Sequence, residues 1–239
     1  MNRTDDNIFV ETLEYRRFAE FCDACRQCQY IGLCYGSPGV GKTLSARRYS
    51  RWDKVEGVKT RDLSDAQLQE FAQLDAVLYT TPVVNPPREI ERDIAKLRHL
   101  LQDFFQEPVR REETRALKQI QKRDADHQGT FFSEHDWLFE KMPTLEPTFG
   151  QVCREYSIRQ RAMGDPTRLI LVDEADRLRM ASLEQMRAIF DAGGIGLVLI
   201  GMPGIEKRLA RYPQFYSRIG FVHEFRIVPL DLQELVDGL

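Results

Sequence analysis

The chain has 239 residues, a formal net charge of −3 at neutral pH, and 42% hydrophobic and 30% charged residues. This length allows one large domain or two small ones. The charge excludes a globally basic coat for nucleic acid but not a local basic patch. No stretch approaches the roughly 18 apolar residues of a membrane helix, and the first residues form no apolar signal region. We therefore expect a cytoplasmic protein with no membrane partner.

The N-terminal stretch predicts a helix over residues 10–29, so residues 1–30 are expected to form a helical lead-in. Five residues recur there at helical spacing: Phe18, Phe21, Cys22, Cys25 and Cys28. Two interpretations are open. The three cysteines, with Cys34 as a fourth ligand, suit a metal or iron–sulfur site. The spacing shared with the aromatic residues favours instead a buried helix face with reduced thiols.

A glycine-rich segment follows the apolar run at residues 31–35 and precedes a helix-like run that begins at Leu44. It has the spacing G-x-x-x-x-G-K-T. Glycines let backbone N–H groups surround a phosphate chain, and the helix N-terminus adds partial positive charge. Lys42 is expected to reach the β- and γ-phosphates, and Thr43 to ligate Mg²⁺. The expected nucleotide contacts are Gly36, Ser37, Pro38, Gly39, Val40, Gly41, Lys42, Thr43 and Leu44.

The rest of the chain alternates apolar strands with helices, which predicts a parallel sheet covered on both faces. The expected strands are residues 31–35, 76–81, 168–172, 195–200 and 221–228. The expected later helices are residues 44–52, 63–68, 88–105 and 182–192, and one that Pro203 opens. Residues 107–165 are too long for a simple connection and should carry structure of their own. Within them, the aromatic residues of 128–150 are expected to cover a core or to form a partner surface.

Two carboxylates follow the third expected strand, where Leu169-Ile170-Leu171-Val172 leads into Asp173 and Glu174. Ligands of an open parallel sheet bind at this carboxyl edge. Asp173 is suited to hold Mg²⁺, directly or through water. Glu174 is suited to deprotonate an attacking water. An ordinary helix cap is the alternative for such acidic residues, but the glycine-rich loop favours catalysis.

The motifs GSPGVGKT, LILVDEAD and GMPG together resemble the AAA+ class of ATPases. Within that class, the chain is similar to the DNA-transposition regulators of the TnsC, TniB and Mu B type. The resemblance implies an α/β core of five parallel strands in the order 5-1-4-3-2, with ATP and Mg²⁺ as cofactors. It places the ATPase core at residues 31–230, with an insertion at about 107–165, and the start of a lid segment at 231–239. The lid is therefore expected to be absent or truncated.

Two features of the resemblance concern hydrolysis. The fourth AAA+ strand usually ends in a polar residue that touches the γ-phosphate, but Gly201 and Met202 stand there, and Met202 donates no such hydrogen bond. Arg218 lies at the position that resembles the arginine finger, which a neighbouring subunit supplies. Arg208 and Arg211 are alternative fingers. We therefore expect slow, assembly-dependent hydrolysis in a ring or a helical filament.

A candidate DNA contact lies in the insertion. Four cations at i, i+4, i+7 and i+11 would form one helical stripe: Arg111, Arg115, Lys118 and Lys122. Val109, Ala116 and Ile120 would lie on the opposite face. Such a row can follow a phosphate backbone; the alternative is a solvated face offset by Glu112 and Glu113. Lys59 and Arg61 are further candidates.

The leading hypothesis from the sequence is an ATP-dependent regulator of transposition. It would oligomerise on duplex DNA, present the target to a transposase and respond to a target-selection protein. One alternative is an ATPase that resembles a helicase loader. The other is a nucleotide switch with no direct contact to DNA.

Overall fold

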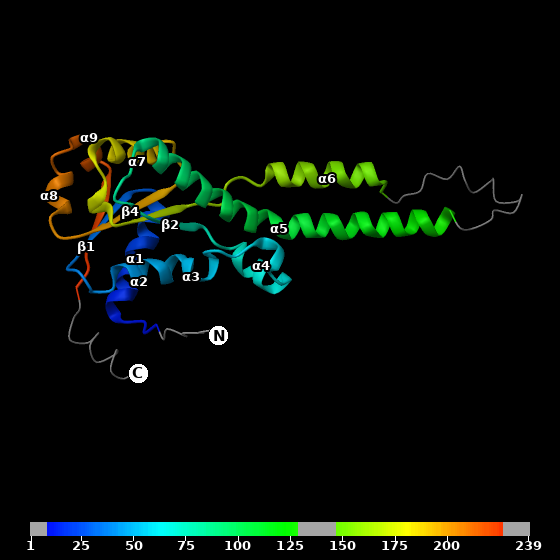
Figure 1. Cartoon of the computed structure of the whole chain (residues 1–239), viewed down its shortest axis with the longest axis horizontal. Coiled ribbons are helices and arrows are strands. Elements are labelled where there is room, and N and C mark those ends of the chain that lie inside the picture. Colours follow the sequence, from blue (N-terminus) through cyan, green and yellow to red (C-terminus); the bar gives the residue numbers. More distant parts are fainter. Residues whose placement is uncertain (1–8, 129–146, 227–239) are drawn as a thin grey trace, which may run out of the picture. The chain divides into compact units, whose positions relative to one another are not determined.

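The computed structural model describes residues 9–128 and 147–226 (Figure 1). Most of the aromatic segment expected at 128–150 and the lid segment expected at 231–239 lie outside these residues. The chain divides into two compact units. The first consists of Met1–Val58, Leu74–Leu101 and Thr167–Leu239, and the second of Lys59–Gln73 and Gln102–Pro166. No helix among the described residues is both long enough and apolar enough to cross a membrane.

The first unit is built on a five-stranded sheet in which all paired strands are parallel. Its strands are β1 (Ile31–Tyr35), β2 (Ala76–Thr80), β3 (Leu169–Asp173), β4 (Gly196–Gly201) and β5 (Ile219–Glu224). Their order is β2-β3-β4-β1-β5, which confirms the expected AAA+ order. Every residue of β3 and β4 is buried, as continuous apolar runs require of central strands.

Helices cover both faces of this sheet. Among the described residues, the helices wholly within the first unit are α1 (Leu13–Cys28), α2 (Lys42–Ser50), α3 (Trp52–Val55), α7 (Met180–Asp191), α8 (Ile205–Leu209) and α9 (Pro213–Tyr216). α1 packs on β1, β4 and β5, and α2 packs on β2 and β3. Tyr49 of α2 donates to Asp23 of α1 at 2.7 Å. Figure 1 shows α7 on the opposite side of the sheet from α1 and α2.

Two C-terminal boundaries differ from the expected ones. β5 begins at Ile219 and not at residue 221, because Ile219 already pairs with Ile31 of β1. β5 ends at Glu224, which pairs with Tyr35, the last residue of β1 before the glycine-rich loop. Pro203 does not open a helix. Gly204 has φ 102°, a left-handed conformation that separates Pro203 from the helical turns of α8.

The cysteines of α1 belong to its packing against the sheet. Cys22 and Cys25 are buried with Phe18 and Phe21, as the helical-face interpretation predicts. Burial raises the pKa of the Cys25 thiol to about 12. Cys28 is exposed, contrary to that interpretation, because the helix ends there and its neighbour turns left-handed. No group of three or more His, Cys, Asp or Glu side chains that could hold a metal ion occurs within residues 9–128 and 147–226.

Gly32 of β1 is required by the close approach of α1. A Cβ on Gly32 would overlap Cys25 Sγ and lie 2.6 Å from a ring carbon of Phe21. We expect Gly32→Ala to lower the free energy of unfolding by about 1–3 kcal/mol, since both neighbours are buried and cannot move aside. Denaturant unfolding checks this, with Gly164→Ala as the control, because no atom lies near its Cβ position. Equal stability of the two variants would contradict the proposed packing.

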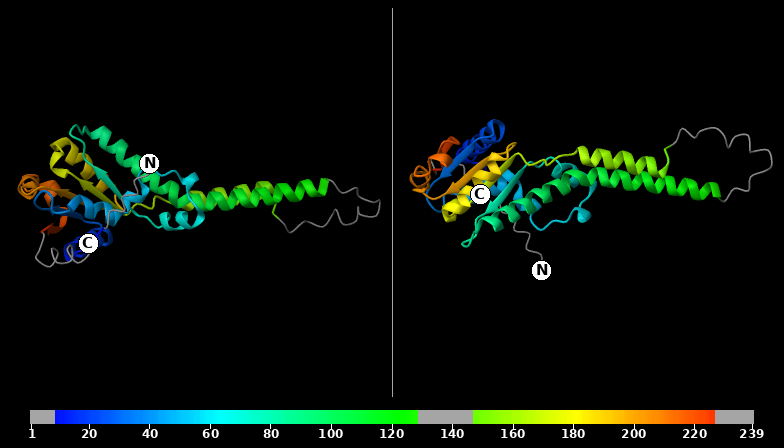
Figure 2. Two further views of the ribbon diagram at one scale, coloured as in Figure 1. Left: turned by 60° about the horizontal axis from the view of Figure 1, so that its bottom comes forward. Right: turned by 90° about the horizontal axis from the view of Figure 1, so that it is seen from above.

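The part of the second unit that the structure describes is helical. It contains a short 3₁₀ turn (Thr60–Asp62), α4 (Asp65–Phe71), the part of α5 (Pro87–Gln128) from Gln102 onward, and α6 (Phe149–Ala162). α6 lies alongside α5 (Figure 2). Ser64 and Thr148 begin α4 and α6 with capping boxes.

The expected helix at 88–105 was too short. Pro108 lies inside α5, where it removes one backbone donor and would normally end a helix. The helix continues because apolar side chains on both sides of the proline, Phe104, Val109 and Ile120, are buried along it. Packing therefore outweighs the local breaker.

Candidate nucleotide site

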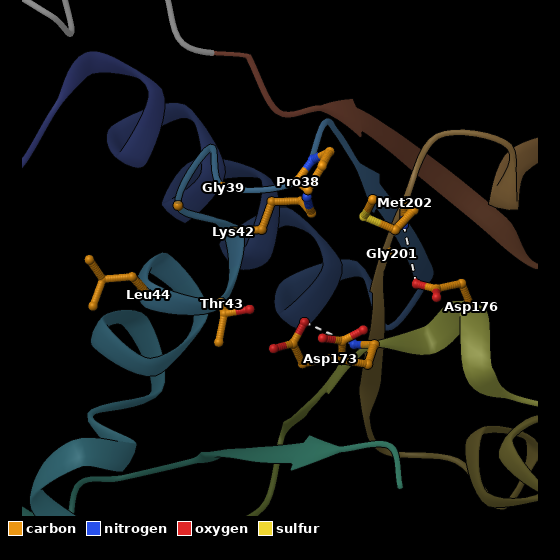
Figure 3. A pocket seen from close by; sticks show the side chains of 11 residues that line it. Pro38, Gly39, Lys42, Thr43, Leu44, Asp173, Asp176, Gly201 and Met202 are labelled. Atoms are coloured by element: carbon orange, nitrogen blue, oxygen red, sulfur yellow. Dashed lines mark hydrogen bonds between the residues drawn. The ribbon is translucent and has the colours of Figure 1, made fainter. Parts of the chain in front are cut away.

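A pocket of about 330 Å³ lies at the carboxyl edge of the sheet, entirely within the first unit (Figure 3). Three segments line it: the glycine-rich loop, the end of β3 and the end of β4. The lining residues are Pro38, Gly39, Gly41, Lys42, Thr43, Leu44, Asp173, Glu174, Asp176, Gly201 and Met202. The fold therefore brings together the loop and the two carboxylates that were singled out in the sequence. Gly36, Ser37 and Val40 belong to the loop but do not line the pocket.

Glycines are required in the loop for two different reasons, backbone conformation and lack of space. Gly39 and Gly41 have φ 78° and 98°, which other residues rarely adopt. Gly36 is needed for space, because a Cβ there would overlap the carbonyl oxygen of Phe225. The Phe225 N–H in turn donates to Tyr35 O at 2.7 Å. The chain after β5 therefore packs directly against the start of the loop.

Lys42 is held at the centre of the loop. Its Nζ donates to the carbonyl oxygens of Gly36 and Ser37, each at 2.7 Å. An ammonium group has three donors, so one remains beyond these two bonds. Lys42 also begins α2, so its charge adds to the partial positive charge of that helix end. The arrangement suits a bound anion such as a phosphate chain.

Asp173 and Thr43 form the part of the pocket that suits a divalent cation. Asp173 is 4% exposed, and its Oδ1 accepts from the Glu174 N–H at 2.9 Å. Its Oδ2 is buried and has no hydrogen-bond partner within the described residues. Figure 3 shows the oxygen atoms of Thr43 and Asp173 on the same side of the pocket. One hydroxyl and one carboxylate with an unused buried oxygen fit Mg²⁺, which keeps several waters as its other ligands.

Glu174 follows in a left-handed backbone conformation, with φ 55° and ψ 37°. Such strain in a residue other than glycine is concentrated at functional sites. Arg177 lies near its carboxylate, with 3.6 Å between Nη2 and Oε2, and donates from Nη1 to Thr81 O at 3.1 Å. The turn that carries Glu174 is thereby fastened to the end of the neighbouring strand.

Asp176 is a pocket residue that the sequence interpretation missed. Its Oδ1 accepts from the Met202 N–H at 3.3 Å (Figure 3). The signal that was available is the third acidic residue in the run Asp-Glu-Ala-Asp. Arg208 donates to Asp176 O at 2.6 Å and to Ala175 O at 3.1 Å. This alternative finger therefore stabilises the turn of its own chain.

Arg218 does not line the pocket of its own chain. Its Nε and Nη2 donate to the two carboxylate oxygens of Asp191 at 2.7 and 3.0 Å. The pKa of Asp191 is lowered, and its hydrogen bonding to Arg218 is the largest cause. Arg187 also bonds to Asp191, at 2.8 Å. Arg211, the other alternative finger, has an exposed side chain.

The expected DNA stripe lies in the second unit, and its two halves differ. Arg111 and Arg115 both pair with Asp65 of α4, and they lower the pKa of that carboxyl. Lys118 and Lys122 are exposed, and no ion pair to either occurs within the described residues.

The two acidic residues named as offsets of the stripe, Glu112 and Glu113, make contacts to α6: Glu112 pairs with Arg159, and Glu113 accepts from Gln160. Arg111 pairs in addition with Glu107 of α5 at 3.3 Å. Val109 and Ile120 are buried, as the opposite face requires.

A parallel sheet with a phosphate loop after β1 and an acidic pair after β3 defines a P-loop nucleoside triphosphatase core. The model of the AAA domain family matches residues 25–209, and the chain belongs to this family. A "potential ATP-binding protein" of Staphylococcus aureus is 39% identical over 226 residues, which cover 93% of this chain and 69% of that protein. The Aeropyrum pernix ORC1 protein, solved in complex with DNA, is 18% identical with a TM-score of 0.48. That comparison covers 98% of this chain, which spans 51% of the ORC1 chain.

Proposed function

We propose that this chain is a Mg²⁺-dependent ATPase that regulates transposition by assembling on duplex DNA. The observation that carries the proposal is the joining of the phosphate loop with Asp173 and Glu174 in one pocket. ATP is favoured as the nucleotide by family membership and by the description of the Staphylococcus relative.

The residues of the pocket suit in-line attack of water on the γ-phosphorus. Lys42 and the loop N–H groups hold the β- and γ-phosphates, and Thr43 and Asp173 hold Mg²⁺, which offsets the negative charge of these phosphates. Glu174 accepts a proton from the attacking water as the new P–O bond forms and the bond to the β-phosphate oxygen breaks. The products are ADP and inorganic phosphate.

Assembly is the second part of the proposal. Arg218 would reach the pocket of a neighbouring subunit, and a head-to-tail contact of this kind generates rings or filaments. ATP binding would favour the assembly on DNA, and hydrolysis would dissolve it. The assembly would then present the bound DNA to a transposase and a target-selection protein.

The contact with DNA is proposed for the stripe on α5. Lys118 and Lys122 make no ion pair within the described residues, whereas Arg111 and Arg115 both pair with Asp65. Lys118 and Lys122 are therefore the residues to change in a test of DNA binding. A contact of this kind depends on phosphates and not on base sequence.

Electron microscopy with duplex DNA and a slowly hydrolysed ATP analogue tests this function. We expect rings or filaments on DNA, and salt-dependent binding that weakens in the Lys118→Glu/Lys122→Glu double variant, with the salt slope reduced by about 1 for each lost phosphate contact. Lys207→Glu is the control, because Lys207 is also exposed but lies on α8. Unchanged binding by the double variant would refute the stripe.

The two rival functions give different outcomes in the same experiment. A helicase-loader-like ATPase would form an assembly that depends on a protein client and not on DNA. A nucleotide switch without DNA contact would form no assembly on DNA at any salt concentration. Either outcome contradicts the proposed function.

A further inference from the structure

The end of β4 lacks a polar side chain toward the pocket. Gly201 and Met202 stand there, and both line the pocket. A thioether is at most a weak acceptor and donates no hydrogen bond. A water placed against the γ-phosphate would therefore receive no orientation from the side chains of β4.

Asp176 reaches this place from the turn after β3. Its Oδ1 accepts from the Met202 N–H, so the carboxylate lies against the end of β4 (Figure 3). A Cβ on Gly201 would lie 3.2 Å from that same oxygen and 2.8 Å from Ile205 Cδ1. A side chain at position 201 would therefore need space that Asp176 and Ile205 already occupy, which explains why a glycine stands there.

The position of Asp176 is fixed by its surroundings. It belongs to a 3₁₀ turn (Ala175–Arg177) that begins with the fully buried Ala175. Arg208 holds the carbonyl groups of both residues through two of its guanidinium nitrogens. Asp176 Oδ2, by contrast, makes no hydrogen bond to any part of the chain that the structure describes. One oxygen therefore anchors the side chain to the end of β4, the other has no partner among the described residues, and Asp176 itself lines the pocket.

We propose that Asp176 is a catalytic residue whose Oδ2 accepts a hydrogen bond from the attacking water. This inference rests on the proposed function. The water has two protons: one passes to Glu174 as the oxygen attacks the γ-phosphorus, and the other is held by Asp176, which orients the oxygen lone pair. The bond between the γ-phosphorus and the ADP oxygen breaks, and no further reactant is needed. Asp176 thus supplies the orientation that β4 does not.

This role has a consequence that packing alone would not produce. A carboxylate in the pocket repels the triphosphate in the ground state, because like charges at short range oppose binding. Removing the charge should therefore strengthen ATP binding while it slows turnover. A residue that only supports the fold would weaken both when it is changed.

Asp176→Asn tests the assignment, because the amide keeps an oxygen for the Met202 N–H. We expect kcat to fall by roughly 10-fold or more, with several-fold tighter binding of ATP and Mg²⁺ in equilibrium titration and an unchanged melting temperature. Asp176→Ala, which also loses the anchor, should show the same loss of kcat. Asp93→Asn is the control: it removes an equal charge from a carboxylate that does not line the pocket.

The outcomes separate this inference from the function on which it rests. Wild-type turnover that survives in Asp176→Asn overturns the role of Asp176 alone. A melting temperature, affinity and kcat that all fall together also overturn it, in favour of a structural role. A wild-type chain that binds ATP and Mg²⁺ without any turnover overturns the proposed hydrolysis and the role of Asp176 together.

Discussion

Glu174→Gln is expected to lower the turnover of ATP by about 100-fold or more and to leave ATP binding intact. The amide has nearly the shape of the carboxylate but cannot take a proton from water. It should also tolerate the left-handed backbone at this position as well as glutamate does, since the two side chains differ only at their ends. Phosphate release and equilibrium titration with a fluorescent ATP analogue measure the two effects separately.

The matched control for this variant is Glu89→Gln. Glu89 is exposed in the first turn of α5 and does not line the pocket, so the same chemical change should leave both measurements unchanged. Normal phosphate release by Glu174→Gln would refute its assignment as the base. Loss of ATP binding together with turnover would instead assign Glu174 a role in holding the nucleotide.

Local signals were sufficient for the core of the fold and for most of the pocket. The strand expected at residues 31–35 matches β1. A short apolar run bounded by a glycine-rich turn is too short for most helices, so a buried strand is the structure that it favours. The loop and the pair Asp173–Glu174 could be recognised because their residue types follow from phosphate and metal chemistry. Both lie at strand ends, so the parallel sheet brings them to one edge.

The features that the sequence did not reveal depend on contacts between distant residues. Asp176 appears as a pocket residue only when β4 is placed beside β3, since its partner Met202 is 26 residues away. Arg111 and Arg115 look like a free cationic row until α4 brings Asp65 to them. The continuation of α5 through Pro108 likewise depends on burial, which a local helix rule does not include.

Under the proposed function, Arg218 is the residue expected to link hydrolysis to assembly. The guanidinium of Arg218 binds both carboxylate oxygens of Asp191 through two hydrogen bonds. The same bidentate geometry binds phosphate oxygens. Release from Asp191, or a shared contact with it, would let Arg218 enter a neighbouring pocket. Hydrolysis would then require a neighbour, and a free subunit would keep its ATP.

Arg218→Ala is accordingly expected to bind ATP normally and to lose assembly-dependent turnover by about 100-fold or more, because an arginine finger stabilises charge that develops on the transferred phosphoryl group. Asp191→Asn is the control, since it removes the same ion pair but leaves the guanidinium, and it should keep turnover in the assembly. A comparable loss in Asp191→Asn would mean that the ion pair supports the fold and that Arg218 is not a finger.

Mixing two inactive variants gives the sharper test. A subunit with Arg218→Ala retains Glu174, and a subunit with Glu174→Gln retains Arg218. If each pocket takes its arginine from the next subunit, an equal mixture contains complete sites at about a quarter of its interfaces. We therefore expect turnover to reappear on mixing, in proportion to the fraction of such interfaces as the ratio is varied. A mixture that stays inactive at every ratio, although it assembles on DNA like the wild type, would show that Arg218 does not act on a neighbour.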